Sequence, residues 1–272
     1  MESAAGTSLH QLQKDLIAQA PQSARYGAPS DLVLTTSALL QDRLPNERGM
    51  VEMNKPQIVQ NWARLTRGLT RMARFLEREG VFDGARLPTN AVLAVIAAAY
   101  DLIPEDGEHA AKGERLLRRY LRSSFFTDRY ENAAASRAFA DYRALKVLLA
   151  DPAFDEQKLD AVPVLNRTDY PLADEDSLLT AGWPKKIGIR ARAVQAVTTL
   201  LRARDFADDQ PASPENVGRC EYHHVFRSAR RRGDGRGGGR GAELRPDQLE
   251  DQPHPGAQGP PRLPQGARAV CR

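Results

Sequence analysis

Two adjacent histidines, His223 and His224, are the residues of this chain best suited to chemistry. A neutral imidazole binds divalent metal ions and also exchanges a proton near pH 7. The pair lies in the run CEYHHVF, whose aromatic and β-branched residues predict a strand over 220–226. Neighbouring side chains of a strand point to opposite faces. One histidine can therefore bind a metal ion while the other acts as a base, where the strand bends into a loop. An incidental or structural pair is the alternative.

The sequence changes character directly after this run. From Arg227 to Arg272 it holds 10 Arg, 9 Gly and 6 Pro, and no Ile, Phe, Tyr or Trp. This composition cannot bury a core, so a disordered tail is predicted over 227–272. One alternative is a genuine RGG-like arm that binds nucleic acid through RGDGRGGGRG, at 232–241. That stretch lacks the aromatic residues that often accompany such arms.

Charge and cysteine content narrow the class of protein. The net charge is +4, and the 10 Arg and five acidic residues of the tail account for all of this excess. The near-neutral body therefore gives no argument for DNA binding from its overall charge. Two cysteines form no disulfide framework, which favours a reducing cytoplasm. The N-terminus has no signal-peptide pattern, and the longest apolar run, Ala91 to Tyr100, is too short to span a membrane.

Apolar spacing in the body predicts an all-α fold, an irregular multi-helix bundle. The clearest helix is expected over 54–79, with Asn54 as its cap and Gly80 at its end. Its apolar positions recur at steps of three and four: Ile58, Trp62, Leu65, Leu69, Met72 and Leu76. The run AVLAVIAAAY is apolar on nearly every side, which predicts a helix at the centre of the bundle. Further helices are expected over 31–40, 112–121, 134–149 and 186–206, and a loop with short helices over 151–185.

Changes in composition divide the chain into four segments. Residues 1–30 are polar and rich in Ala and Ser, and a poorly ordered N-terminus is predicted there. A helical domain is expected over 31–206. A linker and the predicted strand occupy 207–226, and the tail occupies 227–272.

Several runs of the chain resemble the GmrSD-like restriction endonuclease family. The run LLRARDFADDQPASPENVGRCEYHHVF, at 200–226, is similar to the linker and first strand of that family's C-terminal HNH module. Upstream, NW at 61–62, LPTNAVLAVIAAAY at 87–100 and FFTDRYENAAASRAFADYRAL at 125–145 resemble the helical region that precedes the nuclease. The order and spacing of these motifs agree over about 30–226.

This resemblance implies a ββα-metal site that hydrolyses DNA phosphodiesters. By motif position His224 is the general base and His223 the metal-side residue. The divalent metal of the intact family is Mg²⁺ or Mn²⁺, and its partner is DNA. The family also carries an N-terminal nucleotide-binding domain of ParB-like type with a D-G-Q-Q-R motif, which this chain lacks. The chain is therefore expected to be truncated, with that domain or a partner subunit supplied separately.

A shifted reading frame is the leading explanation for the tail. In the family, proline and an asparagine-bearing segment follow the strand, whereas Arg227 and the Arg/Gly/Pro tail follow it here. Read one nucleotide out of frame, residues 243–255 permit the peptide NCALISWKTNRTL. Its two asparagines fall at or near Glu243 and Gln252. Without this remainder a metal site cannot form, so no DNA cleavage is expected.

Two other functions remain open at this point. The chain can be a helical module that binds protein or nucleic acid and carries a disordered basic tail. It can also be a live metal nuclease that a partner chain completes. Metal-dependent plasmid nicking separates the live nuclease from the truncated one. Salt-dependent DNA binding that requires the tail favours the helical binding module.

Overall fold

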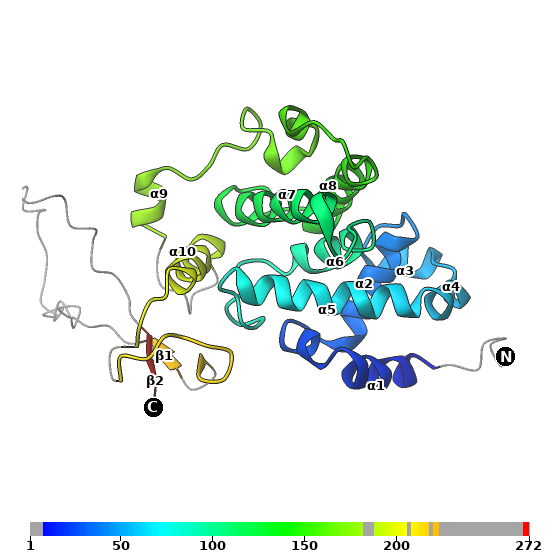
Figure 1. Ribbon diagram of the computed structural model, residues 1–272, viewed down its shortest axis with the longest axis horizontal. Coiled ribbons are helices and arrows are strands. Elements are labelled where there is room, and N and C mark those ends of the chain that lie inside the picture. Colours follow the sequence, from blue (N-terminus) through cyan, green and yellow to red (C-terminus); the bar gives the residue numbers. More distant parts are fainter. Residues whose placement is uncertain (1–7, 182–187, 206–207, 218–219, 223–268, 272) are drawn as a thin grey trace, which may run out of the picture.

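Helices make up nearly all of the regular structure of this chain (Figure 1). The computed structural model describes residues 8–181, 188–205, 208–217, 220–222 and 269–271. In chain order the elements are α1 (Leu9–Gln19), η1 (Pro21–Arg25), α2 (Pro29–Leu40), α3 (Glu47–Glu52), α4 (Lys55–Gln60), α5 (Trp62–Arg78), α6 (Ala91–Ala99), α7 (Gly107–Phe126), α8 (Ala134–Leu149), η2 (Glu156–Ala161), η3 (Pro163–Leu165), α9 (Glu175–Leu179), α10 (Ile189–Leu200), β1 (Cys220–Tyr222) and β2 (Ala269–Cys271). The predicted all-α character of the body is confirmed for these residues.

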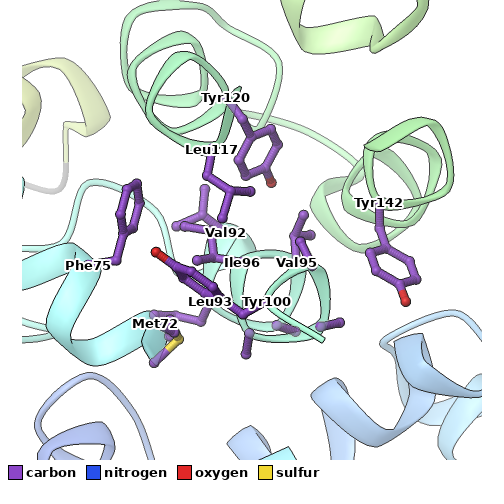
Figure 2. Close-up of a cluster of buried hydrophobic side chains, with 14 of the residues drawn as sticks. Met72, Phe75, Val92, Leu93, Val95, Ile96, Tyr100, Leu117, Tyr120 and Tyr142 are labelled. Carbon is purple, nitrogen blue, oxygen red and sulfur yellow. The ribbon is translucent and has the colours of Figure 1, made fainter. Parts of the chain in front are cut away.

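Helix α6 lies at the centre of the bundle, as its apolar sequence predicts. Every residue from Val92 to Ala99 is buried, and the helix contacts α2, α5 and α8. Figure 2 shows side chains of α6 surrounded by residues of α5, α7 and α8, among them Phe75, Leu117 and Tyr142. Among the described residues, no helix is both long and apolar enough to cross a membrane.

The helix predicted over 54–79 is divided into α4 and α5 at Asn61. This residue leaves helical geometry (φ −92°, ψ 9°), and its side chain accepts a hydrogen bond from the guanidinium of Arg64 at 2.9 Å. Asparagine favours such local side-chain bonds over helix interiors. The expected cap at Asn54 is also not formed, because that side chain makes no capping hydrogen bond.

Two glycines allow α5 to approach its neighbours closely. A Cβ on Gly68 would lie 2.4 Å from the carbonyl oxygen of Ala97, so only glycine lets α5 and α6 come this near. Gly80 ends the helical segment with φ +81°, and a Cβ there would lie 2.4 Å from the carbonyl oxygen of Ala196 in α10. Because neither contact tolerates a side chain, these glycines fix how α5 sits against α6 and α10.

The prediction of a poorly ordered N-terminus needs correction for the described residues from 8 onward. Ser8 caps α1 through its side chain, and Leu12, Leu16 and Ala20 are buried in the core. Tyr26 is buried as well and donates a hydrogen bond to the carbonyl of Val81 at 2.8 Å. Tertiary packing therefore orders a segment whose own composition is polar.

The remaining predicted helices are found with shifted ends. Helix α7 is longer than the predicted 112–121, while α8 has the predicted bounds, and α10 is shorter than 186–206. The segment over 151–185 contains η2, η3 and α9, as expected of a loop with short helices. Near the C-terminus, β1 pairs with β2 in antiparallel register, Cys220 opposite Cys271. Residues 223–226 of the predicted strand and most of the predicted tail, 227–268 and 272, lie outside the described residues.

Candidate nucleic-acid interface

The predicted catalytic residues lie outside the part of the chain that the structure describes. His223 and His224 follow directly after β1, and Glu243 and Gln252 are in the tail. Their roles as metal-side residue, general base and asparagine positions stay predictions. Within the described residues, no group of three or more His, Cys, Asp or Glu side chains is placed to hold a metal ion.

A row of arginines is the most prominent chemical feature of the described residues. It runs along the solvent-facing side of α5 at steps of three and four residues: Arg64, Arg67, Arg71, Arg74 and Arg78. The opposite side of the same helix carries Leu65, Leu69 and Leu76, which are buried in the core. Residues three and four apart share one face of a helix, so this arginine row is continuous. At 1.5 Å per residue it extends over about 21 Å.

A groove of about 500 Å³ accompanies the arginine row. Its lining comprises Gln19, Thr66, Arg67, Thr70, Arg71, Arg74, Arg78, Tyr100, Glu105 and Glu114. Four arginines face two glutamates, which leaves an excess of positive charge. The threonine hydroxyls and the Gln19 amide add neutral groups that hydrogen-bond. Such a lining suits an anion with several oxygen atoms.

Individual arginines of the row differ in how far they are engaged by the protein. Arg71 donates to the carbonyls of Tyr100 and Pro104, at 3.2 and 2.8 Å, and its guanidinium lies 4.4 Å from the centre of the Tyr100 ring. It therefore caps the C-terminal end of α6 and is structural. Arg74 is exposed and makes no hydrogen bond or ion pair with a described residue. It is the arginine of the row most available to a ligand.

The other members of the row form ion pairs at the surface. Arg78 lies 2.9 Å from Glu114 of α7, with its side chain 54% exposed. Arg67 lies 3.9 Å from Asp101, with its side chain 49% exposed. Exposed pairs of this kind contribute about 0–1 kcal/mol. A phosphate group can therefore compete for these guanidinium groups at little cost.

Arg64 and Asp101 form the best-ordered ion pair beside the row. The Arg64 guanidinium donates to both carboxylate oxygens of Asp101. Its Nε donates to Oδ1 at 2.9 Å, and its Nη2 donates to Oδ2. This bidentate contact lowers the pKa of the Asp101 carboxyl below its usual value. The pair ties the beginning of α5 to the second residue after α6.

The stability that this pair contributes is expected to depend on pH. The pKa of the Asp101 carboxyl is lower in the folded protein than in the unfolded chain. The stabilisation by the Arg64–Asp101 pair is therefore complete above the unfolded pKa of about 3.9, and it is lost as the pH falls through the folded pKa. Asp101→Asn should cost about 1 kcal/mol at neutral pH. Urea unfolding at a series of pH values should show this difference shrinking toward about pH 3. A difference that stays constant over this range would contradict the assignment.

A second group of arginines lies on α7. Arg118 and Arg122 converge on the carboxylate of Glu79, with contacts of 2.6 and 3.3 Å. Glu79 is 6% exposed, so it needs this double pairing, and the contact fixes the end of α5 against α7. Arg119 is exposed and makes no hydrogen bond or ion pair with a described residue. Its side chain points to a different side of α7 from that of Arg118.

The aromatic-rich run at 125–132 turns out to organise a buried polar network. Asp141 is fully buried and accepts two hydrogen bonds from the Arg129 guanidinium, at 3.1 and 3.0 Å, and one from the Tyr130 hydroxyl at 2.6 Å. The backbone N–H of Val164 donates a fourth at 3.2 Å. Tyr120 joins through the Tyr130 hydroxyl at 2.8 Å. This network connects α7, α8 and η3.

Burial governs the acidity of this network. It raises the pKa of the Asp141 carboxyl, against the opposing effects of Arg129 and Tyr130. Burial also raises the pKa of the Tyr130 hydroxyl, which therefore stays a donor at neutral pH. With Arg129 only 6% exposed and Asp141 inaccessible, the group is closed to substrates. It is a structural element rather than a reactive one.

Sequence reasoning missed the arginine row. The overall charge of the body does not reveal it, because a near-neutral total conceals a local excess of arginine along one helix face. The signal was present in the helix predicted over 54–79. Its arginines repeat at the same three- and four-residue steps as its apolar residues, displaced to the other face.

Similarity to known proteins adds nothing to this picture. No family model, curated protein or solved structure matches the chain. The GmrSD-like resemblance therefore rests on the motifs quoted above. The arrangement of α5 and α7 has to be interpreted from its own chemistry.

Proposed function

We propose that this chain is a DNA-contacting helical relative of the GmrSD-like restriction endonucleases and has no nuclease activity of its own. The observation that carries the proposal is the arginine row of α5 with its groove and with Arg74, which has no partner among the described residues. Each DNA strand carries a phosphate every 3.4 Å along the duplex axis but winds around that axis, so a straight row of about 21 Å faces only a few phosphates of one strand. Side chains three and four residues apart then meet successive or alternate phosphates.

The composition of the row determines what kind of binding to expect. Guanidinium groups bind phosphate oxygens in a bidentate manner, but phosphate contacts carry no sequence information. Binding should therefore be largely independent of DNA sequence and should weaken steeply with salt. For a labelled duplex, fluorescence anisotropy should give a Kd of about 10⁻⁴–10⁻⁶ M at physiological salt.

The family resemblance supports DNA as the polyanion. Its upstream motifs fall on elements that build the bundle: AVLAVIAAAY is the central helix α6, and FFTDRYEN supplies Arg129 and Tyr130 to the buried network. These residues hold α5 and α7 in place. A helical region that precedes a nuclease is well placed to hold the nucleic acid.

Cleavage is a separate matter, because the metal site of the family does not fit the residues available here. The resemblance makes His224 the base and His223 the metal-side residue, with asparagines contributed from the following segment. In this chain that segment is rich in Arg, Gly and Pro and has Glu243 and Gln252 at the corresponding places. A base without a positioned metal ion and water gives little catalysis.

The 272-residue chain is therefore expected not to nick DNA. Supercoiled plasmid incubated with the chain and Mg²⁺ or Mn²⁺ should remain supercoiled, and a His224→Ala variant should behave identically. Agarose gels of the two reactions provide the measurement. Metal-dependent nicking that disappears in His224→Ala would show a live HNH site and would overturn this part of the proposal.

A further inference from the structure

A second hollow, which we call the α7 cavity, lies between α7 and the segment that carries η2, η3 and α9. Its volume is about 620 Å³, within the range of about 300–1,000 Å³ that is typical of small-molecule sites. None of its lining residues belongs to α5, so it is distinct from the groove of the arginine row. The backbone N–H of Ala173 donates to the carbonyl of Phe126 at 2.7 Å, which closes the segment onto the end of α7.

The lining of the α7 cavity combines two kinds of side chain. Five are apolar: Phe126, Leu159, Leu165, Leu172 and Leu178. The charged ones are three arginines, Arg119, Arg122 and Arg167, and one carboxylate, Asp160. A ligand that suits both kinds has an apolar or aromatic body and an anionic group.

Two of the three arginines lack a counter-ion among the described residues. Arg167 donates to the carbonyl of Val164 at 3.1 Å and to the hydroxyl of Ser123 at 2.5 Å, but it forms no ion pair. Burial lowers the pKa of its guanidinium, against the opposing effect of the Asp160 carboxylate. Arg119 makes no hydrogen bond or ion pair with a described residue, and Arg122 shares Glu79 with Arg118. A cavity lined by three arginines and one carboxylate favours an anionic ligand.

From this arrangement we propose that the α7 cavity binds a nucleotide. Arg119 and Arg122 are three residues apart on α7 and share a face, so Arg119 can bind a phosphate while Arg122, which stays paired with Glu79, lies on the same face. Arg167 approaches from the η3 side, where Ser123 holds it. The base lies against the ring of Phe126 and the exposed Leu172, and Gln157 offers an amide to its edge.

A nucleotide fits better than other anions with an apolar body. The guanidinium groups of Arg119 and Arg167 match a phosphate with two negative charges, whereas a fatty acid offers a single carboxylate. The aromatic ring and polar amide of the lining match a base rather than an acyl chain. The nucleotide has two possible sources: a free mononucleotide, or the 5′-phosphorylated end of a single strand.

Isothermal titration of the full chain tests this proposal. We expect dAMP to bind, and inorganic phosphate and laurate to bind at least tenfold more weakly, about the effect of one good contact. A 5′-phosphorylated oligothymidylate identifies the source. If it binds more tightly than dTMP, and this difference persists in the variant Arg67→Gln/Arg74→Gln, the ligand is a strand end; if the two bind equally in that variant, it is a free nucleotide. No dAMP binding at millimolar concentration, or tighter binding of laurate or phosphate than of dAMP, would overturn the proposal.

Variants of exposed side chains locate the site. Arg119→Gln should weaken dAMP binding about tenfold or more, because it removes a charge-assisted contact to phosphate. Leu172→Ser should weaken dAMP but not inorganic phosphate. Arg143→Gln, which removes an exposed charge from α8 outside the cavity, is the matched control and should change nothing. Equal dAMP affinity in Arg119→Gln and Arg143→Gln would place the ligand elsewhere.

The nucleotide site and the DNA-binding face can fail separately. The variant Arg67→Gln/Arg74→Gln alters only the arginine row, so it should retain full dAMP affinity. Loss of dAMP binding in that variant would mean that nucleotides bind to the arginine row and not to the α7 cavity.

Discussion

Replacing Arg129 by methionine is expected to lower the free energy of unfolding by about 3–5 kcal/mol, a large share of the stability of a domain. The change leaves the Asp141 carboxylate buried with only Tyr130 and the Val164 N–H as partners. An uncompensated charge at 0% exposure either stays ionised at high cost or takes up a proton. Urea denaturation followed by far-UV circular dichroism gives the change in unfolding free energy.

Two further variants show whether the loss belongs to the charge pair. Arg143→Met removes an exposed arginine from α8, the helix that carries Asp141, and should change stability by about 0.5 kcal/mol or less. The double variant Arg129→Met/Asp141→Leu should lose less than the sum of its two single variants, because no unpaired charge remains. If Arg129→Met were no more destabilising than Arg143→Met, the network would not hold α7, α8 and η3 together.

The central helix and the end of α5 could be predicted because the local sequence determines each of them. A run that is apolar on all sides has no solvent-facing side, so AVLAVIAAAY had to be a buried helix. Gly80 ends its helical segment at positive φ, which the sequence indicated. The ends of α7 were harder to predict, because its first turns are held by packing and not by an apolar stripe of their own.

Features that join distant segments could not be predicted from sequence. Asp141 reads as an ordinary polar position of a helix, and only the fold brings it to Arg129 and Val164. The order of helix α1 was not predicted, because two leucines, Leu12 and Leu16, are a weak signal until they pack into the core. Neither the arginine row nor the α7 cavity follows from composition. The arginine row is a local excess of positive charge within a body of near-zero net charge, and the α7 cavity combines residues from four elements.

The double variant Arg67→Gln/Arg74→Gln is expected to weaken duplex DNA binding by about tenfold or more near physiological salt. Each guanidinium that contacts a phosphate releases a counter-ion on binding. Removing two of them should therefore reduce the slope of log Kd against log salt by about two. Both side chains are exposed, neither caps a helix, and Asp101, which lies 3.9 Å from Arg67, keeps its closer pair with Arg64 in the variant. Thermal unfolding of the variant should match that of the unchanged protein, so a loss of binding would not reflect a loss of fold.

Matched variants separate the arginine row from the basic tail. Arg143→Gln controls for the loss of a surface charge on the helical body. A tail variant, with Arg232, Arg236 and Arg240 changed to glutamine, tests the RGG-like alternative. If only the tail variant loses affinity, the tail binds the DNA. If no variant changes affinity and an acidic protein binds the arginine row instead, the chain is a protein-binding module.

The most direct test of DNA contact by α5 is the salt dependence of duplex binding. It is measured by fluorescence anisotropy on the full chain, the double variant Arg67→Gln/Arg74→Gln and Arg143→Gln. We predict a slope for Arg143→Gln that is close to that of the unchanged protein, and a slope for the double variant that is smaller by about two. Identical slopes and affinities for all three proteins would contradict the claim that α5 holds the DNA.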